Sequence, residues 1–71
     1  MVAVERSLAN WVDRVRSEYI EMPGLTLTKF QMRRLWHFDA ALCDAVVDTL
    51  LACGFLRRRA DNSYMRASHD F

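Results

Sequence analysis

Cationic side chains that could bind an anion occur in two groups, one within residues 29–34 and one within residues 57–66. Lysine and arginine form charge-assisted hydrogen bonds with phosphate oxygens, and they displace counterions from a nucleic-acid backbone. The other interpretation is that arginines on an edge hairpin keep the domain soluble and block pairing with strands of other molecules. The candidate phosphate-binding residues are Lys29, Arg33, Arg34, Arg57, Arg58, Arg59 and Arg66, with Tyr64 as an additional hydrogen-bond donor.

Two carboxylates, Asp44 and Asp48, would share one face of a helix because they are one turn apart. Such a pair does acid–base chemistry only where a pocket encloses the groups and shifts their pKa values. Nothing nearby in the sequence predicts such a pocket, and no serine or cysteine has a base fixed beside it. We therefore predict a solvated acidic face, no catalytic residue, no cofactor and no enzymatic activity.

A zinc site could be assembled on paper from Cys43, Cys53, His37 and His69. Neither the C-x-x-C nor the H-x-x-x-H spacing typical of zinc ligands occurs. On one helix the two cysteines would lie roughly 15 Å apart, which is beyond the reach of a disulfide. The sequence therefore predicts no metal site and two buried free thiols, as in a reducing cytoplasm.

The composition predicts one small soluble domain over residues 1–71. Hydrophobic residues make up 52% of the chain, which indicates either a dense core or an apolar surface kept for a partner. The net charge is only +1, so nucleic-acid binding would have to come from local clusters of charge. No leader-like segment and no apolar run of membrane length occur, so we expect a cytoplasmic protein that does not contact a membrane.

Apolar residues at helical spacing predict a first helix over residues 3–21. Pro23 and Gly24 end it, because the residue before a proline is pushed out of the α region. A short strand is then expected at residues 25–27, paired with the edge of a later hairpin. The apolar face of the first helix consists of Val4, Leu8, Trp11, Val12, Val15 and Tyr19.

A second helix is predicted over residues 28–36 because Thr28 and Gln31 have the spacing of a capping box. The dipeptide at 37–38 breaks the chain after this helix. We expect its buried face to contain Met32, Leu35 and Trp36.

A third helix is predicted over residues 39–53, with Asp39 as its N-cap and Gly54 as a left-handed residue after its end. Its outer face would carry Asp44, Asp48 and Leu51. The expected buried residues are Leu42, Cys43, Val46, Thr49, Leu50 and Cys53.

A hairpin is predicted over residues 55–66, because the turn-forming pair Asp61-Asn62 separates two short apolar and arginine-rich runs. Residues 67–71 would form a loose tail. The expected fold is therefore mainly α with a small β-hairpin, in the order helix, short strand, helix, helix, strand, strand.

This order of elements resembles a winged helix-turn-helix domain over about residues 4–66. The junction from the third helix to the hairpin is similar to that of MarR-like regulators, and the whole chain resembles small stand-alone bacterial proteins with a Pro-Gly-Leu-x-Leu-Thr opening. The segments that carry the resemblance are Leu27-Thr28, Gln31, Leu35-Trp36, the run from Cys43 to Leu50, Gly54-Phe55-Leu56-Arg57 and Tyr64-Met65-Arg66.

The resemblance implies that the third helix reads the major groove of DNA and that the hairpin, or wing, contacts phosphates or the minor groove. The third helix departs from that pattern, since it contains no Lys, Arg, Asn or Gln. Aspartate can accept a hydrogen bond from cytosine but is repelled by phosphate, so backbone contacts are expected to dominate over base readout. The implied reading surface consists of Ala40, Ala41, Asp44, Val47, Asp48 and Leu51.

Two functions remain open from the sequence. The first is a bacterial DNA-binding regulator that grips backbone phosphates, with a homodimer formed through the apolar stripe of the first helix. The second is a winged-helix module that binds a protein and does not bind DNA. The candidate protein-contact residues of this alternative are Phe30, Asp44, Val47, Asp48 and Leu51.

Overall fold

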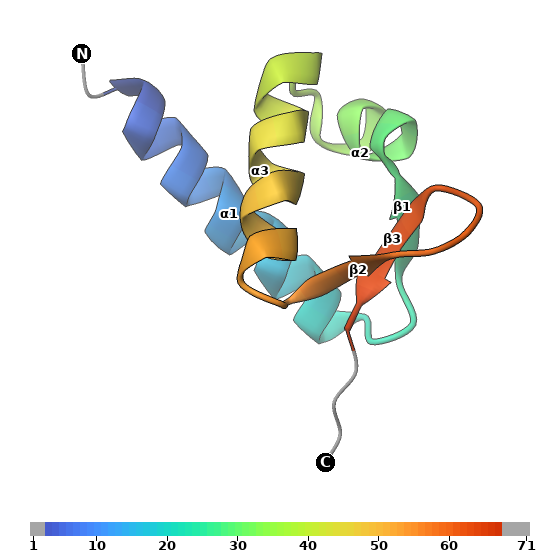
Figure 1. The fold of residues 1–71 in the computed structure, drawn as a ribbon. Helices are drawn as coiled ribbons and strands as arrows, with labels where there is room; N and C mark the ends of the chain where they lie inside the picture. Colours follow the sequence, from blue (N-terminus) through green and yellow to red (C-terminus); the bar gives the residue numbers. More distant parts are fainter. Residues whose placement is uncertain (1–2, 68–71) are drawn as a thin grey trace.

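Three helices and a three-stranded antiparallel sheet make up a computed structural model that describes residues 3–67, with side chains described from residue 8 onward. The mainly helical α+β class and the order of elements confirm the predicted winged-helix layout. The elements, drawn in Figure 1, are α1 (Ala3–Glu21), β1 (Thr26–Thr28), α2 (Lys29–Trp36), α3 (Ala40–Ala52), β2 (Leu56–Arg58) and β3 (Ser63–Arg66).

Helix α3 lies between α1 on one side and the sheet with α2 on the other (Figure 1). The N-terminal turns of α1 extend past the other helices, and the loop between β2 and β3 points away from all of them. In the sheet, β3 is central and pairs antiparallel with both β1 and β2. The predicted short strand therefore pairs with the hairpin, one residue later in the chain than expected.

Local capping interactions begin α2 and α3 where the sequence predicts. The Gln31 amide donates to the Thr28 hydroxyl (3.1 Å), and the Thr28 amide donates to the Gln31 side-chain oxygen (2.9 Å). The Asp39 carboxylate accepts a hydrogen bond from the Leu42 amide (2.8 Å). Between the helices His37 takes a left-handed conformation with φ of 58°, which ends α2 and turns the chain toward α3.

Helix α3 ends in a Schellman motif and leads directly into the wing. The Gly54 amide donates to the Leu51 carbonyl (3.1 Å), and the Phe55 amide donates to the Leu50 carbonyl (2.9 Å). Gly54 has φ of 80°, so the predicted left-handed residue is confirmed. Strand β2 begins two residues later, at Leu56.

The turn of the wing is a three-residue loop over residues 60–62, a common hairpin form in which a left-handed residue follows a type I turn. The Asn62 amide donates to the Arg59 carbonyl (3.0 Å), and the Arg59 amide donates to the Ser63 carbonyl (2.8 Å). Asn62 has φ of 69°, a conformation that asparagine tolerates better than most residues. The predicted turn pair Asp61-Asn62 thus lies in the loop.

Tyr19 ties α1 to the sheet from inside the core. Its side chain is fully buried, and its hydroxyl donates to the Tyr64 carbonyl on β3 at 2.8 Å. The Leu27 backbone on β1 lies close to the same hydroxyl, so one side chain contacts two strands. Burial, the larger effect, raises the pKa of Tyr19, while the nearby Leu27 backbone acts in the opposite direction.

The buried face of α3 differs from the predicted stripe. Thr49 and Cys53 are exposed, whereas Val47, which was expected outside, is fully buried. The physical reason is that α3 is contacted by α1 on one side and by β2 and α2 on another, so its apolar face is rotated toward Val47. The buried residues of α3 are Cys43, Val46, Val47 and Leu50.

Two further core predictions need correction around α2. Leu35 is 52% exposed and does not join Met32 and Trp36 in the core. Its place is taken by Phe38 from the break, whose ring packs edge-on against Trp11 (4.9 Å between centroids) and Trp36 (6.0 Å). A residue expected only to break the chain is therefore part of the core.

The left-handed residue after α3 gives a test of the fold. Gly54→Ala should lower the free energy of unfolding by about 1 kcal/mol, because a Cβ is disfavoured at positive φ. Gly24→Ala is the matched control, since neither glycine has another atom within 4 Å of the added Cβ and only Gly54 has positive φ. Urea unfolding would measure both variants, and equal effects would contradict the assignment.

The Tyr19 bridge gives a second test. Tyr19→Phe should destabilise the domain by about 1–3 kcal/mol, because it leaves a buried backbone acceptor without its donor. Tyr64→Phe is the control, since no hydrogen bond of the Tyr64 hydroxyl occurs within residues 8–67. Thermal unfolding should rank Tyr19→Phe as the less stable variant, and the opposite order would refute the bridging role.

Candidate nucleic-acid interface

The wing presents three consecutive exposed arginines, Arg57, Arg58 and Arg59. Arg57 pairs in register with Met65, and Arg58 pairs with Tyr64, so their side chains leave opposite faces of the sheet. Within the described part of the chain, none of the three forms an ion pair. These guanidinium groups therefore remain free to contact an external anion.

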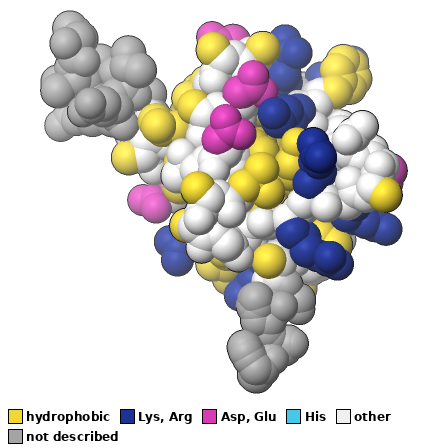
Figure 2. Space-filling model, viewed as in Figure 1, with side chains coloured by type: hydrophobic (Ala, Val, Ile, Leu, Met, Phe, Trp, Pro, Cys, Tyr) yellow, Lys and Arg dark blue, Asp and Glu magenta, His cyan; other side chains and the backbone are white. Residues whose placement is uncertain are grey.

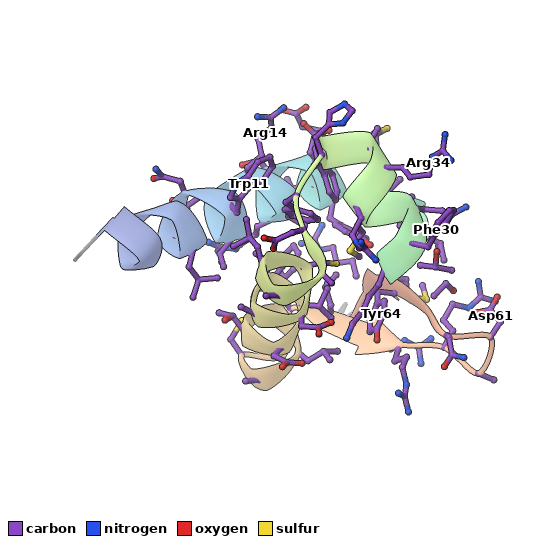
Figure 3. All side chains as sticks on the ribbon, turned by 90° about the horizontal axis from the view of Figure 1, so that it is seen from above. Trp11, Arg14, Phe30, Arg34, Asp61 and Tyr64 are labelled. Atoms are coloured by element: carbon purple, nitrogen blue, oxygen red, sulfur yellow. The ribbon has the colours of Figure 1, made fainter. Side chains whose placement is uncertain are left out.

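Asp61 is the one carboxylate in the wing loop, and its hydrogen bonds hold the turn together. Its Oδ1 accepts hydrogen bonds from the Ser63 hydroxyl (2.6 Å) and the Ser63 amide (3.0 Å). These bonds lower the pKa of Asp61, and the nearby charge of Arg59 adds a smaller effect in the same direction. Asp61 thus stays ionised at the tip of the wing, where Figure 3 labels it.

Lys29 is engaged within the molecule. Its Nζ lies 2.9 Å from the Asp44 Oδ1 on α3 and 6.0 Å from the centre of the Tyr64 ring. The hydrogen bond to Asp44 is the main cause that raises the pKa of Lys29, and the charge of Asp48 contributes further. The sequence did not reveal this pair, because its members belong to different helices and are 15 positions apart.

The second pair of predicted cations lies on α2, where both arginines are exposed. The Arg34 guanidinium sits 5.7 Å from the centre of the Phe30 ring, and both side chains project from the outer surface of α2 (Figure 3). An open hollow of about 410 Å³ lies beside them. It is lined by Phe30, Arg33, Arg34, His37, Phe38 and Asp39.

Arg66 is separated from the tip of the wing. Its guanidinium lies 5.6 Å from the centre of the Phe55 ring, and that of Arg16 from α1 lies at the same distance. Phe55 in turn packs edge-on against Tyr19, with 6.4 Å between ring centres. Arg16 was missed as a candidate because it belongs to the mixed-charge face of α1, where nothing in the sequence marks it.

Tyr64, predicted as a hydrogen-bond donor to the nucleic-acid backbone, is only 5% exposed. Its ring lies between α3 and the sheet (Figure 3). The prediction is therefore corrected: Tyr64 belongs to the core, and it contributes to the surface through the lysine that lies over its ring.

The outward face of α3 is acidic and smaller than the sequence implied. Asp44 and Asp48 are exposed, but Val47 is fully buried and Leu51 packs partly against the core. Figure 2 shows the acidic side chains over α3, basic ones over the sheet and α2, and hydrophobic ones between them. Of the predicted protein-contact patch, Phe30 is strongly exposed, at 64%, while Val47 contributes no surface.

The described residues hold no metal site, since no group of three or more potential ligands comes together in that part of the chain. Both thiols are free, but Cys53 is exposed, against the prediction that it is buried. Cys43 is buried near the Lys29 carbonyl, and this burial raises the pKa of its thiol. His69, the fourth candidate ligand, lies outside the described residues.

Comparison with protein-family profiles, with curated proteins and with solved structures gives no significant match. In residues 3–67, none of the helices combines the length and the apolar character needed to cross a bilayer.

Thiol reactivity gives a test of the corrected burial. With Ellman's reagent on the folded protein, we expect one fast thiol per chain, Cys53, because Cys43 is inaccessible and its pKa is raised. Cys53→Ser should remove the fast phase, and urea should make Cys43 react as well. Two fast thiols in the native protein would contradict the burial of Cys43.

Proposed function

We propose that this chain is a small winged-helix DNA-binding protein that grips duplex DNA mainly through backbone phosphates. The observation that carries the proposal is the run of exposed arginines Arg57, Arg58 and Arg59 on the wing, which form no ion pair within residues 8–67. Arginine at the edge of a groove neutralises phosphates and needs no particular base sequence.

The electrostatics of the neighbouring helix support contact with the backbone and not with the bases. Lys29 offsets the charge of Asp44, which leaves Asp48 as the carboxylate of α3 without an ion pair in the described chain. Helix α3 has no Lys, Arg, Asn or Gln to read a guanine or adenine edge in the major groove, and the Thr49 hydroxyl donates within the helix to the Ala45 carbonyl (2.8 Å). A role in transcription would then require modest sequence preference or a partner that supplies it.

Further cations extend the proposed contact surface. Arg33 and Arg34 on α2 form the second group. Lys29 and Arg66 are also part of the proposed surface, although Lys29 is paired with Asp44 and Arg66 lies over the Phe55 ring. In this proposal the protein acts in the cytoplasm, where the DNA of a bacterium lies. The homodimer through α1 stays a prediction. Leu8, Trp11 and Val12 of its apolar stripe already pack partly against the core of their own chain, so less of the stripe is left for a partner.

A salt titration of binding to random duplex DNA tests the proposal. The double variant Arg57→Ala, Arg59→Ala should reduce the slope of log K against log salt by roughly 1.8, or about 0.9 for each phosphate that is no longer neutralised. Arg14→Ala is the control, because it removes a charge from α1 outside the proposed contact surface, and Arg57→Ala alone is its matched wing variant. Fluorescence anisotropy of a labelled duplex is a suitable measurement.

The expected result is a reduced slope for the wing variant and an unchanged slope for the control. No measurable binding at low salt would overturn the proposal. An equal reduction in both variants would mean that net charge, and not the wing, governs the affinity.

The second candidate is a protein-interaction module. It is favoured by one observation: two large apolar residues of the same short helix are exposed, Phe30 at 64% and Leu35 at 52%. Exposed large apolar residues on one element often mark a contact surface for another protein. Absence of DNA binding in the titration would leave this module as the preferred function.

A further inference from the structure

The surface between α3 and the wing carries both signs of charge in separate rows. Seen from the side of Figure 1, acidic side chains follow α3, basic side chains lie over the sheet, and hydrophobic ones fill the strip between them (Figure 2). We call this surface the α3–wing face. The residues on which the inference depends are Asp44, Asp48 and Leu51 from α3, with Lys29, Arg58 and Tyr64 opposite them.

The pairing of the strands places Arg58 on this face. Arg58 lies opposite Tyr64 in the register of β2 and β3, so its side chain leaves the sheet on the same side as the Tyr64 ring. Leu56, two residues earlier on the same side, is buried in the core. Arg58 therefore projects from the same side of β2 as the buried Leu56, but it lies past the core and is exposed at the edge of the apolar strip.

One ion pair across the strip is already made within the molecule. Lys29 binds Asp44 at 2.9 Å, which closes one end of the strip. Asp48, one turn further along α3, and Arg58 have no ion-pair partner within residues 8–67. The α3–wing face therefore presents one free carboxylate on one edge and one free guanidinium on the other.

A twofold axis that lies in the plane of this face and runs along the apolar strip turns a second copy to face the first and exchanges the two edges. It would place Asp48 of one copy against Arg58 of the other, form the same contact a second time, and bring the two apolar strips together. Closed dimers are built in this way, from a patch that is complementary to itself. We propose that the α3–wing face is an interface between two copies of this chain.

Other occupants satisfy only part of the surface. A duplex would place phosphates against Asp48, an acidic peptide would meet the same repulsion, and a basic peptide would repel Arg58. A second copy supplies both charges on the two sides of an apolar strip. A standard interface covers about 800 Å² on each partner, and the described surface totals 4877 Å². One face of the domain is enough for such an interface.

The proposed dimer would compete with DNA for Arg58, because this arginine belongs to both proposed contacts. Rising protein concentration would then lower the fraction of wings free to bind a duplex. The dimer itself does not rest on the proposed function, since it needs only the two charges and the strip. Its test is therefore made in the absence of DNA.

Charge exchange at the two edges tests the dimer. Sedimentation equilibrium at low salt should give a dimer for the native sequence, and the dimer should dissociate as salt rises and screens the two ion pairs. Asp48→Arg alone and Arg58→Glu alone should each be monomeric, because each places like charges together twice. An equimolar mixture of the two variants should associate, and the double variant Asp48→Arg, Arg58→Glu should recover the homodimer.

Both positions are exposed, and circular dichroism will verify that each variant is folded. Recovery of association in the mixture cannot come from misfolding, so it supports the proposed contact directly. A native protein that stays monomeric at low salt would overturn the inference. So would a dimer that withstands both single exchanges, because its contact would then lie on another surface.

Discussion

The Tyr19 hydroxyl, buried between α1 and the sheet, is the constraint on which the position of the wing depends. It donates to β3 and lies close to the backbone of β1, so one helix contacts two strands that are far apart in the sequence. Strands of three and four residues have little stability of their own. Their position therefore depends on packing against α3 and on this hydroxyl, and the arginines of the wing are positioned by the same contacts.

The exposed surface is divided into regions of opposite charge, which differ in the ligands they can bind. The wing and α2 carry cations that are free or stacked on rings, whereas the outward face of α3 carries carboxylates, one of them bound by Lys29. A surface that both attracts and repels phosphate favours contact at the backbone over deep entry into a groove. The same division makes the α3–wing face complementary to itself. Binding to DNA and binding to a second copy thus depend on one arrangement of charge.

Features that depend on neighbouring residues in the sequence could be predicted, and those that depend on distant contacts could not. The capping box at Thr28, the cap at Asp39 and the left-handed Gly54 involve residues within a few positions of one another, and all three occur as expected. The buried face of α3 was misplaced because α1, α2 and β2 together decide it, and a helical repeat alone does not show which elements surround the helix.

The same distinction applies to the candidate site. Exposure of the arginines at positions 57–59 follows from their place in a short edge hairpin and was predicted. The attachment of Lys29 to Asp44 and the stacking of Arg66 on Phe55 depend on how the elements meet in three dimensions. Both side chains were counted as free cations, and the structure shows that each already contacts a neighbour.

The connection between α3 and β2 is short and held rigidly by backbone hydrogen bonds. Cys53, Gly54 and Phe55 are the connecting residues, and the backbone amide of each donates a hydrogen bond to a carbonyl at the end of α3. A tilt of α3 would therefore be transmitted to the base of the wing and amplified toward its tip, as by a short rigid lever. Any molecule that pushes on the helix would steer the arginines without touching them.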